Sequence, residues 1–354
     1  MRRIAVLPGD GIGKEVVPAA LKALAALEES SGIRYQTELF DYGADRYLAS
    51  GVTLPEGQLE AFGAYDAILL GALGDPRVPD NAHARDILFG IRFGLDLYVN
   101  HRPIRLLHER LCPLKGKTPE DVDFVVLREN TEGAYVDVGG VFKRGTPDEV
   151  AVNEDVNTRK GVERILRHAF ELARSSGRGK VAMADKSNAL RHAHGLWLRA
   201  FEEVGAEYPD VERRHYYVDA IAMQMVRSPE EFEVIVTSNL FGDILTDLGA
   251  ALQGGLGMAA SANVHPGGAA MFEPVHGSAP PLAGRDVANP MGAILTCALM
   301  VEHLGDAAGG RLLEEAVRAA LVEGVCTPDV GGTRGTSDVA EWITARVRRG
   351  AGRE

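Results

Sequence analysis

One run of residues fixes the fold class, Phe232-Glu-Val-Ile-Val-Thr-Ser-Asn-Leu-Phe-Gly-Asp-Ile-Leu-Thr-Asp-Leu-Gly249, because an apolar strand passes directly into a helix. Asp243 and Asp247 are four positions apart on that helix, so both side chains lie on one face, roughly 5–6 Å apart at Cβ. Two carboxylates so close raise each other's pKa unless a cation lies between them. Oxygen ligands favour Mg²⁺ or Mn²⁺ over zinc. Because ligands bind at strand ends in α/β proteins, we expect a metal site here rather than two acids on a solvated helix face.

The N-terminal part of the chain repeats the strand-then-helix pattern. The pattern predicts strands at 3–7, 34–40 and 67–72 and helices at 15–28 and 54–62. This alternation is typical of an α/β fold with a mostly parallel sheet. The turn Pro8-Gly-Asp-Gly-Ile-Gly13 lacks the third glycine of G-x-G-x-x-G, so it is weak support for a Rossmann dinucleotide site.

Length and composition limit the classes of protein that the chain can belong to. With 354 residues, of which 45% are hydrophobic, the chain can form two packed domains. A net charge of −12 argues against nucleic acid or an anionic membrane as the main partner. Cys112, Cys297 and Cys326 are scattered, which favours a reducing cytoplasm over a disulfide framework or a zinc site. We find no apolar segment of signal-peptide or membrane-spanning length.

Three arginines are candidates for binding an anionic substrate. Arg92 follows Leu88 and Phe89 on a predicted helix, and Arg102 and Arg128 lie at predicted strands or strand ends. The planar guanidinium group suits bidentate binding of a carboxylate. The alternatives are a core helix face with a snorkelling arginine, or an ordinary structural ion pair for any one of them.

Two further charged residues have both a functional and a structural interpretation. In the stretch 180–188 we predict a strand that ends on Lys186, where the lysine is either a surface residue or a base with a lowered pKa. Asp219 begins an apolar helix, where it is either a favourable N-terminal charge or a third metal ligand. The segment 134–158 alternates short β-prone pieces with glycines, which predicts a hairpin arm suited to clasping a second subunit.

Loops rich in small residues occupy much of the chain between 254 and 290. Small residues and exposed backbone amides allow a flat ring or a phosphate to approach closely. His276 and Asn289 could then bond an adenine or a ribose. The alternative is a turn-rich loop that needs no ligand.

Four motifs, in this order, resemble those of the β-decarboxylating dehydrogenases: Leu7-Pro-Gly-Asp-Gly-Ile-Gly13, Arg128-Glu-Asn-Thr-Glu-Gly133, Asn239-Leu-Phe-Gly-Asp-Ile-Leu-Thr-Asp247 and Glu273-Pro-Val-His-Gly-Ser-Ala-Pro280. This isocitrate/isopropylmalate dehydrogenase family includes 3-isopropylmalate, isocitrate, homoisocitrate and tartrate/D-malate dehydrogenases. The resemblance covers nearly the whole chain. It implies the family's two-domain α/β fold with a parallel or mixed central sheet, which is not a Rossmann fold. It also implies a dinucleotide-side domain, 1–98 and 253–354, and a central substrate and dimerisation domain, 99–252.

The resemblance implies metal- and NAD-dependent oxidative decarboxylation of a 2-hydroxy acid with a carboxylate on C3. Asp243 and Asp247 would hold Mg²⁺ or Mn²⁺ together with Asp219 from the other subunit of a homodimer. Lys186, also from the other subunit, would take the hydroxyl proton, and Tyr135 would protonate the enolate after CO₂ departs. Arg92, Arg102 and Arg128 would bind the carboxylates. The residues implied at the dinucleotide are Ile12, His276, Gly277, Ser278, Ala279 and Asn289.

The positions expected to determine cofactor and substrate specificity differ between this chain and some of its relatives. Pro281 stands where NAD-using members similar to isopropylmalate dehydrogenase have an aspartate for the ribose hydroxyls. The Lys-Tyr pair of NADP-dependent isocitrate enzymes is absent too, so NAD is favoured, although Arg285 is close in sequence. The helix segment with Leu88 and Phe89 lacks the Ser-Leu-Asn pattern of isocitrate enzymes and suits an apolar tail.

These features favour 3-isopropylmalate as substrate, and therefore leucine biosynthesis. The alternative is a tartrate/D-malate dehydrogenase, because the Arg128–Gly133 motif and the segment Thr158–Phe170 look similar to those enzymes and Ala189 is small for a pocket wall. A different class is a catalytically silent regulatory subunit. Such a subunit would be expected to have lost a catalytic residue, whereas the tyrosine, the lysine and the three acids are all present.

Overall fold

The computed structural model describes residues 1–350, which form two compact α/β units. Unit 1 consists of Met1–Leu97, Arg105–Pro119 and the chain from Ala250 onward, and unit 2 consists of Tyr98–Ile104 and Glu120–Gly249. The chain therefore crosses between the units more often than the expected boundaries imply. The segment Arg105–Pro119, which we expected in the central domain, belongs to unit 1.

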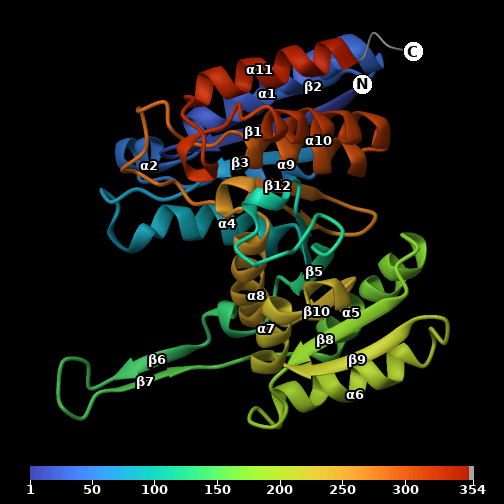
Figure 1. Ribbon diagram of the computed structural model, residues 1–354. Helices are drawn as coiled ribbons and strands as arrows, with labels where there is room; N and C mark the ends of the chain where they lie inside the picture. Colours follow the sequence, from blue (N-terminus) through green and yellow to red (C-terminus); the bar gives the residue numbers. More distant parts are fainter. Residues whose placement is uncertain (351–354) are drawn as a thin grey trace. The chain divides into compact units, whose positions relative to one another are not determined.

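Unit 1 is a five-stranded mixed sheet covered by helices (Figure 1). Its strands, in spatial order, are β2 (Tyr35–Leu39), β1 (Arg2–Gly9), β3 (Ala67–Ala72), β12 (Ala270–Pro274) and β11 (Ala260–Val264). Its helices are α1 (Gly13–Ser31), α2 (Ala44–Ser50), α3 (Gln58–Phe62), α4 (Ala82–Gly94), α9 (Met291–His303), α10 (Ala307–Val322) and α11 (Thr336–Gly350). Short 3₁₀ turns lie at Pro79–Asn81, Glu109–Leu111, Leu256–Met258 and Pro328–Val330.

The strands β1 and β3 form the centre of unit 1. They pair in parallel, with Val6 opposite Leu69 and Leu7 opposite Leu70, and all six residues of β3 are buried. The pair β11–β12 is antiparallel, so the sheet differs from the all-parallel Rossmann arrangement, as the resemblance implied. Sequence analysis missed β11 and β12, because the small residues of Ala260-Ser-Ala-Asn-Val264 do not form an apolar run.

A buried carboxylate joins three segments of unit 1 directly after β1. Asp10 accepts hydrogen bonds from the backbone N–H groups of Ala44, at 2.7 Å, and Gly74, at 2.9 Å. Its Oδ2 atom also lies 2.8 Å from Nε2 of His83 at the start of α4, and both side chains are buried. The glycine turn is therefore fixed to the helix that carries Leu88, Phe89 and Arg92.

The strands of unit 2, in spatial order, are β4 (Val99–Arg105), β5 (Asp123–Glu129), β10 (Val234–Thr237), β8 (Lys180–Asp185) and β9 (Glu212–Tyr217). The unit is built around β10, which pairs in parallel with β5 and β8, and β8 pairs in parallel with β9. Its helices are α5 (Arg159–Ser175), α6 (Ala193–Gly205), α7 (Val218–Arg227) and most of α8 (Asn239–Leu252), with a 3₁₀ turn at Pro229–Glu231. The four residues of β10 are all buried, so the chain enters α8 from the interior of the unit.

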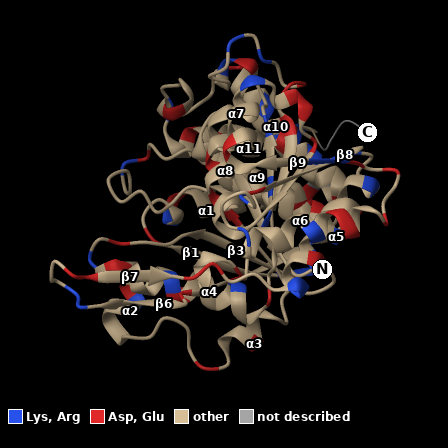
Figure 2. Cartoon of the chain, turned by 90° about the horizontal axis from the view of Figure 1, so that it is seen from below, with Lys and Arg blue, Asp and Glu red and all other residues tan. Residues whose placement is uncertain are grey.

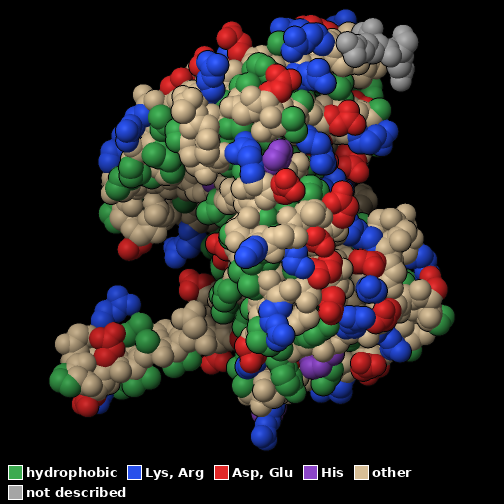
Figure 3. Space-filling model, viewed as in Figure 1, with side chains coloured by type: hydrophobic (Ala, Val, Ile, Leu, Met, Phe, Trp, Pro, Cys, Tyr) green, Lys and Arg blue, Asp and Glu red, His purple; other side chains and the backbone are tan. Residues whose placement is uncertain are grey.

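A hairpin arm projects from unit 2, as the glycines and β-prone pieces of 134–158 predicted (Figures 1 and 3). The 3₁₀ turn Ala134–Val136 leads into β6 (Gly139–Phe142), which pairs antiparallel with β7 (Val150–Asn153). The arm exposes the large apolar side chains Val138, Val141, Phe142, Val150 and Val152. An isolated two-stranded hairpin is marginally stable in water, so these side chains are suited to contact another surface.

Charged residues of both signs are interspersed along the elements of each unit (Figure 2). Many exposed arginines pair with acids, for example Arg174 with Asp210 and Arg167 with Glu207. In the part of the chain that the structure describes, no helix is both long and apolar enough to span a membrane.

Candidate active site

The carboxylates of α8 lie together on a partly open face of unit 2. The side chains of Asp243 and Asp247 are 41% and 62% exposed, respectively, so a solvated ion can reach them. Burial, followed by the negative charge of Asp243, raises the pKa of Asp247. This repulsion is the effect expected of two carboxylates one helical turn apart.

Two buried arginines from neighbouring strands supply the positive charge that the run itself lacks. Nη1 of Arg128 lies 2.5 Å from Oδ1 of Asp243. Nη2 of Arg102 lies 3.8 Å from the same oxygen, and Nη1 lies 4.0 Å from Oδ1 of Asp247. Residues 237–249 give no indication of these cations, because β4 and β5 are more than a hundred residues away in sequence.

Neutral side chains hold both guanidinium groups in place. Nε of Arg128 donates to Oδ1 of Asn239 at 2.9 Å, and Nη1 of Arg102 donates to Oγ1 of Thr246 at 2.5 Å. Arginines fixed in this way lose little further side-chain entropy when they bind a carboxylate. The cluster therefore brings together the two expected metal ligands and two of the three expected substrate arginines.

Tyr135 joins the same cluster from the 3₁₀ turn at the base of the arm. Its hydroxyl group donates to Oδ2 of Asp243 at 2.8 Å, and its ring centroid lies 5.1 Å from the guanidinium carbon of Arg128. A phenol in this position can exchange a proton with a molecule bound against α8.

Lys186 and Asp219 form a separate pair in unit 2. Nζ of Lys186, just after β8, makes an ion pair with Oδ1 of Asp219 in the first turn of α7. Its contact with Lys186 lowers the pKa of Asp219. Within residues 1–350, no three His, Cys, Asp or Glu side chains converge on one point as a metal site would require. The third ligand thus does not join Asp243 and Asp247 inside one chain, and its contribution from another subunit remains a prediction.

The expected substrate helix, α4, lines a cavity within unit 1. Leu88 and Phe89 face this cavity of about 360 Å³ together with Leu73, Arg85 and Glu273. Such a mixed apolar and charged lining fits a branched tail that is attached to a carboxylate. The cavity is the structural counterpart of the apolar face that we expected from the sequence.

Glu273 is the residue of this region that sequence analysis overlooked. Nη2 of the buried Arg92 lies 2.7 Å from Oε1 of Glu273, which also accepts from Nδ2 of Asn263 at 2.8 Å. The Nε atom of Arg92 is buried and has no hydrogen-bond partner within residues 1–350. Glu273 is the first residue of the motif Glu273–Pro280, but no feature of the sequence around it indicates a pair with an arginine 181 residues away.

The residues expected at the dinucleotide gather at two places in unit 1. The backbone N–H of Ile12 donates to the carbonyl oxygen of Ser278 at 2.8 Å, which joins the glycine turn to the loop 276–279. A Cβ at Gly11 would lie 2.0 Å from that carbonyl oxygen, so only glycine permits the contact. Elsewhere, Nδ2 of Asn289 donates to Oδ2 of Asp329 at 3.0 Å, a partner that we did not anticipate.

His276 provides the test of whether this region fits a dinucleotide. The side chain is buried, and its Nε2 atom has no hydrogen-bond partner within the described residues. Burial also lowers the pKa of the imidazole, which keeps the ring neutral. An unpaired buried polar atom costs about 1–3 kcal/mol, which a ligand hydroxyl or ring nitrogen would recover. The residues therefore fit the expected cofactor.

The position expected to distinguish NAD from NADP carries neither an acid nor a fixed base. Pro281 is exposed, and Nη1 of Arg285 donates to its carbonyl oxygen at 3.3 Å. That bond turns Arg285 toward the backbone of its own loop. A 2′-phosphate is usually bound by a positively charged side chain that points toward it.

Comparisons with known proteins agree with these observations. The family described as isocitrate/isopropylmalate dehydrogenase matches residues 3–343. The chain is 47% identical to a 3-isopropylmalate dehydrogenase of Thermobifida fusca, with 98% of this chain and 97% of the relative covered. It is 48% identical to the protein of the same name from Streptomyces avermitilis, with 97% and 98% covered. Among solved structures, isocitrate dehydrogenase from Methylococcus capsulatus matches with a TM-score of 0.90 at 39% identity, covering 98% of this chain and 100% of that one.

Proposed function

Because the chain belongs to the isocitrate/isopropylmalate dehydrogenase family, we propose that it catalyses the oxidative decarboxylation of 3-isopropylmalate, a reaction of leucine biosynthesis. The observation that carries this choice of substrate is the cavity lined by Leu88 and Phe89. An isopropyl group buried there would contribute roughly 1.5–3 kcal/mol, and a third carboxylate, as in isocitrate, would gain no such energy. The relatives at 47–48% identity bear the name of this activity.

Side chains of the α8 cluster, together with Arg92 and with Lys186 of the other subunit, would supply substrate binding and two proton transfers. Arg92, Arg102 and Arg128 would together hold the two carboxylates of the substrate. Lys186 would take the proton from the C2 hydroxyl group, and Tyr135 would deliver a proton to C3 after CO₂ leaves.

The chemistry that side chains cannot supply requires two added groups. A Mg²⁺ or Mn²⁺ ion at Asp243, Asp247 and Asp219 would polarise the C2 oxygen, and NAD would accept the hydride. The choice of NAD is supported by the orientation of Arg285, and the unpaired Nε2 atom of His276 supports a dinucleotide in general.

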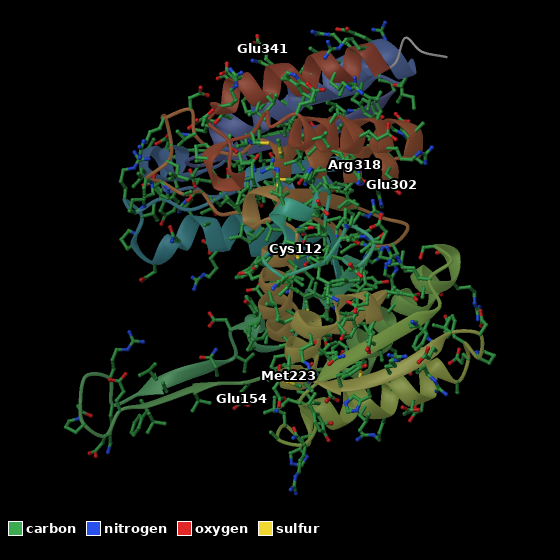
Figure 4. All side chains as sticks on the ribbon, viewed as in Figure 1. Cys112, Glu154, Met223, Glu302, Arg318 and Glu341 are labelled. Atoms are coloured by element: carbon green, nitrogen blue, oxygen red, sulfur yellow. The ribbon has the colours of Figure 1, made fainter. Side chains whose placement is uncertain are left out.

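A homodimer is part of the proposal, since Lys186 and Asp219 lie apart from the α8 carboxylates in one chain. The helix α7 exposes Met223, labelled in Figure 4, and Val226, and α8 exposes Leu240 and Ile244. These apolar side chains lie on the elements that carry Asp219, Asp243 and Asp247, so a second copy that covers them would bring the two sets of residues together.

The first test is a comparison of kcat/KM across 3-isopropylmalate, D-malate, tartrate, isocitrate and homoisocitrate, with NAD and NADP in the presence of Mn²⁺. We expect 3-isopropylmalate with NAD to give the highest value. A higher value for D-malate or tartrate would reject the assigned substrate and favour the alternative that Ala189 and the segment Thr158–Phe170 suggested. Turnover with none of the five, despite metal binding, would indicate a catalytically silent subunit.

A further inference from the structure

His194 is a buried histidine in the first turn of α6 that contacts three elements of unit 2. Its Nδ1 atom accepts a hydrogen bond from the backbone N–H of Lys186 at 3.2 Å. Its Nε2 atom lies 3.3 Å from Oδ2 of Asp155, and its ring centroid lies 5.0 Å from that of Phe241 on α8. No residue implied by the family resemblance explains why a histidine occupies this position.

The contacts of His194 fix its tautomer. A backbone N–H needs an acceptor, so Nδ1 carries no proton and the proton of the neutral ring is on Nε2. The Nε2 atom lies 3.3 Å from Oδ2 of Asp155, outside hydrogen-bond geometry, and this contact lowers the pKa of Asp155. The imidazole therefore accepts a hydrogen bond from Lys186 on one side and makes a close polar contact with a buried carboxylate oxygen on the other.

Asp155 belongs to the base of the arm, close to Tyr135. The backbone N–H of Gly133 donates to the carbonyl oxygen of Val156 at 2.7 Å, and that of Glu154 donates to Val138 at 2.8 Å. Glu154 is labelled in Figure 4 where the arm joins the rest of unit 2. Tyr135 lies inside this closed loop, so Asp155 is part of the frame that holds the tyrosine.

Lys186 depends on its backbone for its position. Beyond its ion pair with Asp219, the ammonium group contacts only the ring of Tyr217, 5.8 Å from the ring centroid, among the interactions that the structure records. The backbone is held more firmly, because the carbonyl oxygen of Lys186 accepts from Ala189 and Leu190 at 2.9 and 2.8 Å while its N–H bonds to His194. A long flexible side chain reaches a defined point only if its Cα is fixed.

We propose that His194, oriented by Asp155, is a positioning residue that fixes the backbone of Lys186 to the base of the arm. The inference rests on the proposed function, in which Lys186 acts in the active site of the partner subunit and the arm clasps that same partner. The same connection then fixes the position of Lys186, which acts in the partner's active site, and the position of the arm, which contacts that partner. His194 touches neither substrate nor cofactor, so its effect is on kcat rather than on KM.

Single variants separate the two contacts of the ring. The amide oxygen of His194→Asn can replace Nδ1 as the acceptor for Lys186, whereas the amide nitrogen of His194→Gln can replace only the polar contact with Asp155. We expect His194→Ala and His194→Gln to lower kcat by about 10- to 100-fold with KM unchanged, and His194→Asn to retain most of it. The matched control is His192→Ala, which removes an exposed histidine two residues away.

The decisive experiment uses heterodimers that contain one complete active site. One chain carries Lys186→Ala and keeps Tyr135, and the other carries Tyr135→Phe and keeps Lys186, so only one site has both residues. His194→Ala is then added to either chain. We expect kcat to fall much further when it is in the chain that provides Lys186 than when it is in the other chain, where only the base of the arm around Tyr135 is affected.

Each result has a separate meaning. Equal losses from both placements would show a general folding defect and overturn the positioning role, as would no loss from either. Both heterodimers contain the same substitutions in total, so impaired folding alone would not produce a difference in kcat between the two placements of His194→Ala. A reference heterodimer as inactive as a Lys186→Ala homodimer would instead reject the sharing of active sites, and with it the proposal that Lys186 serves the partner.

Discussion

Replacing Glu273 by leucine should destabilise the folded chain before any ligand is added. Nη2 of Arg92 lies 2.7 Å from Oε1 of Glu273, and the two side chains are 6% and 12% exposed. Removing one partner of a buried ion pair leaves the other charge without compensation, which costs about 3–5 kcal/mol. We therefore expect the free energy of unfolding of Glu273→Leu to be lower by that amount.

The double variant Arg92→Met with Glu273→Leu provides the control. Replacing both members of a buried ion pair by apolar side chains of similar volume is often close to neutral, so most of the lost stability should return. The measurement is urea-induced unfolding of the ligand-free protein at neutral pH, with the four chains of the cycle compared. A single variant within about 0.5 kcal/mol of the parent would refute the reasoning, because a change that small is typical of a solvated surface charge.

Three further results follow from the same structure. Burial raises the pKa of Glu129 from 4.5 to about 7, so the folded chain keeps a proton that the unfolded chain loses between those values. The contribution of Glu129 to stability should therefore fall by about 3 kcal/mol as the pH rises from 4.5 to 7, and Glu129→Gln should remove this part of the pH dependence measured by unfolding. Phe89→Ala should lower kcat/KM for 3-isopropylmalate relative to D-malate by roughly 10-fold or more, as steady-state kinetics with both substrates would show; an unchanged ratio would contradict the tail assignment. Removal of divalent metal by a chelator should abolish turnover of the parent protein, and added Mn²⁺ should restore it. Asp247→Asn should require a higher Mn²⁺ concentration for half-maximal rate. An identical Mn²⁺ requirement would exclude Asp247 as a ligand.

The sequence predicted those parts of the fold whose signal is local. The apolar run at 67–72 became β3 with the same bounds, and the helix after β10 carries Asp243 and Asp247 on one face. The family prediction was confirmed, because the isocitrate/isopropylmalate dehydrogenase family matches residues 3–343. The strand β11 was missed because its small side chains form no apolar run, and β12 was missed because Ala270-Met-Phe-Glu-Pro274 is too short and ends in a charged residue and a proline.

The partners of the functional residues could not be predicted in the same way. Arg128 was expected to be available for a substrate, yet it is paired with Asp243, and Arg92 is paired with Glu273. Each pair joins positions more than a hundred residues apart, and no rule of spacing relates them. His194 was missed for the same reason, since its value depends on Asp155 and on the backbone of Lys186 rather than on any motif.

These pairings share a physical cause. The guanidinium group of Arg128 would be costly to bury alone, so the ligand-free chain compensates it with Asp243. Lys186 and Asp219 also pair, although both side chains are partly exposed. Arg92, by contrast, is paired with an acid, Glu273, that has no expected role in binding. A cation at α8 would compete with Arg128 for Asp243 and so release the guanidinium group for a carboxylate. Metal and substrate should therefore bind with positive coupling, and Asp243→Asn, which weakens the competition, should reduce that coupling as well as the affinity for metal.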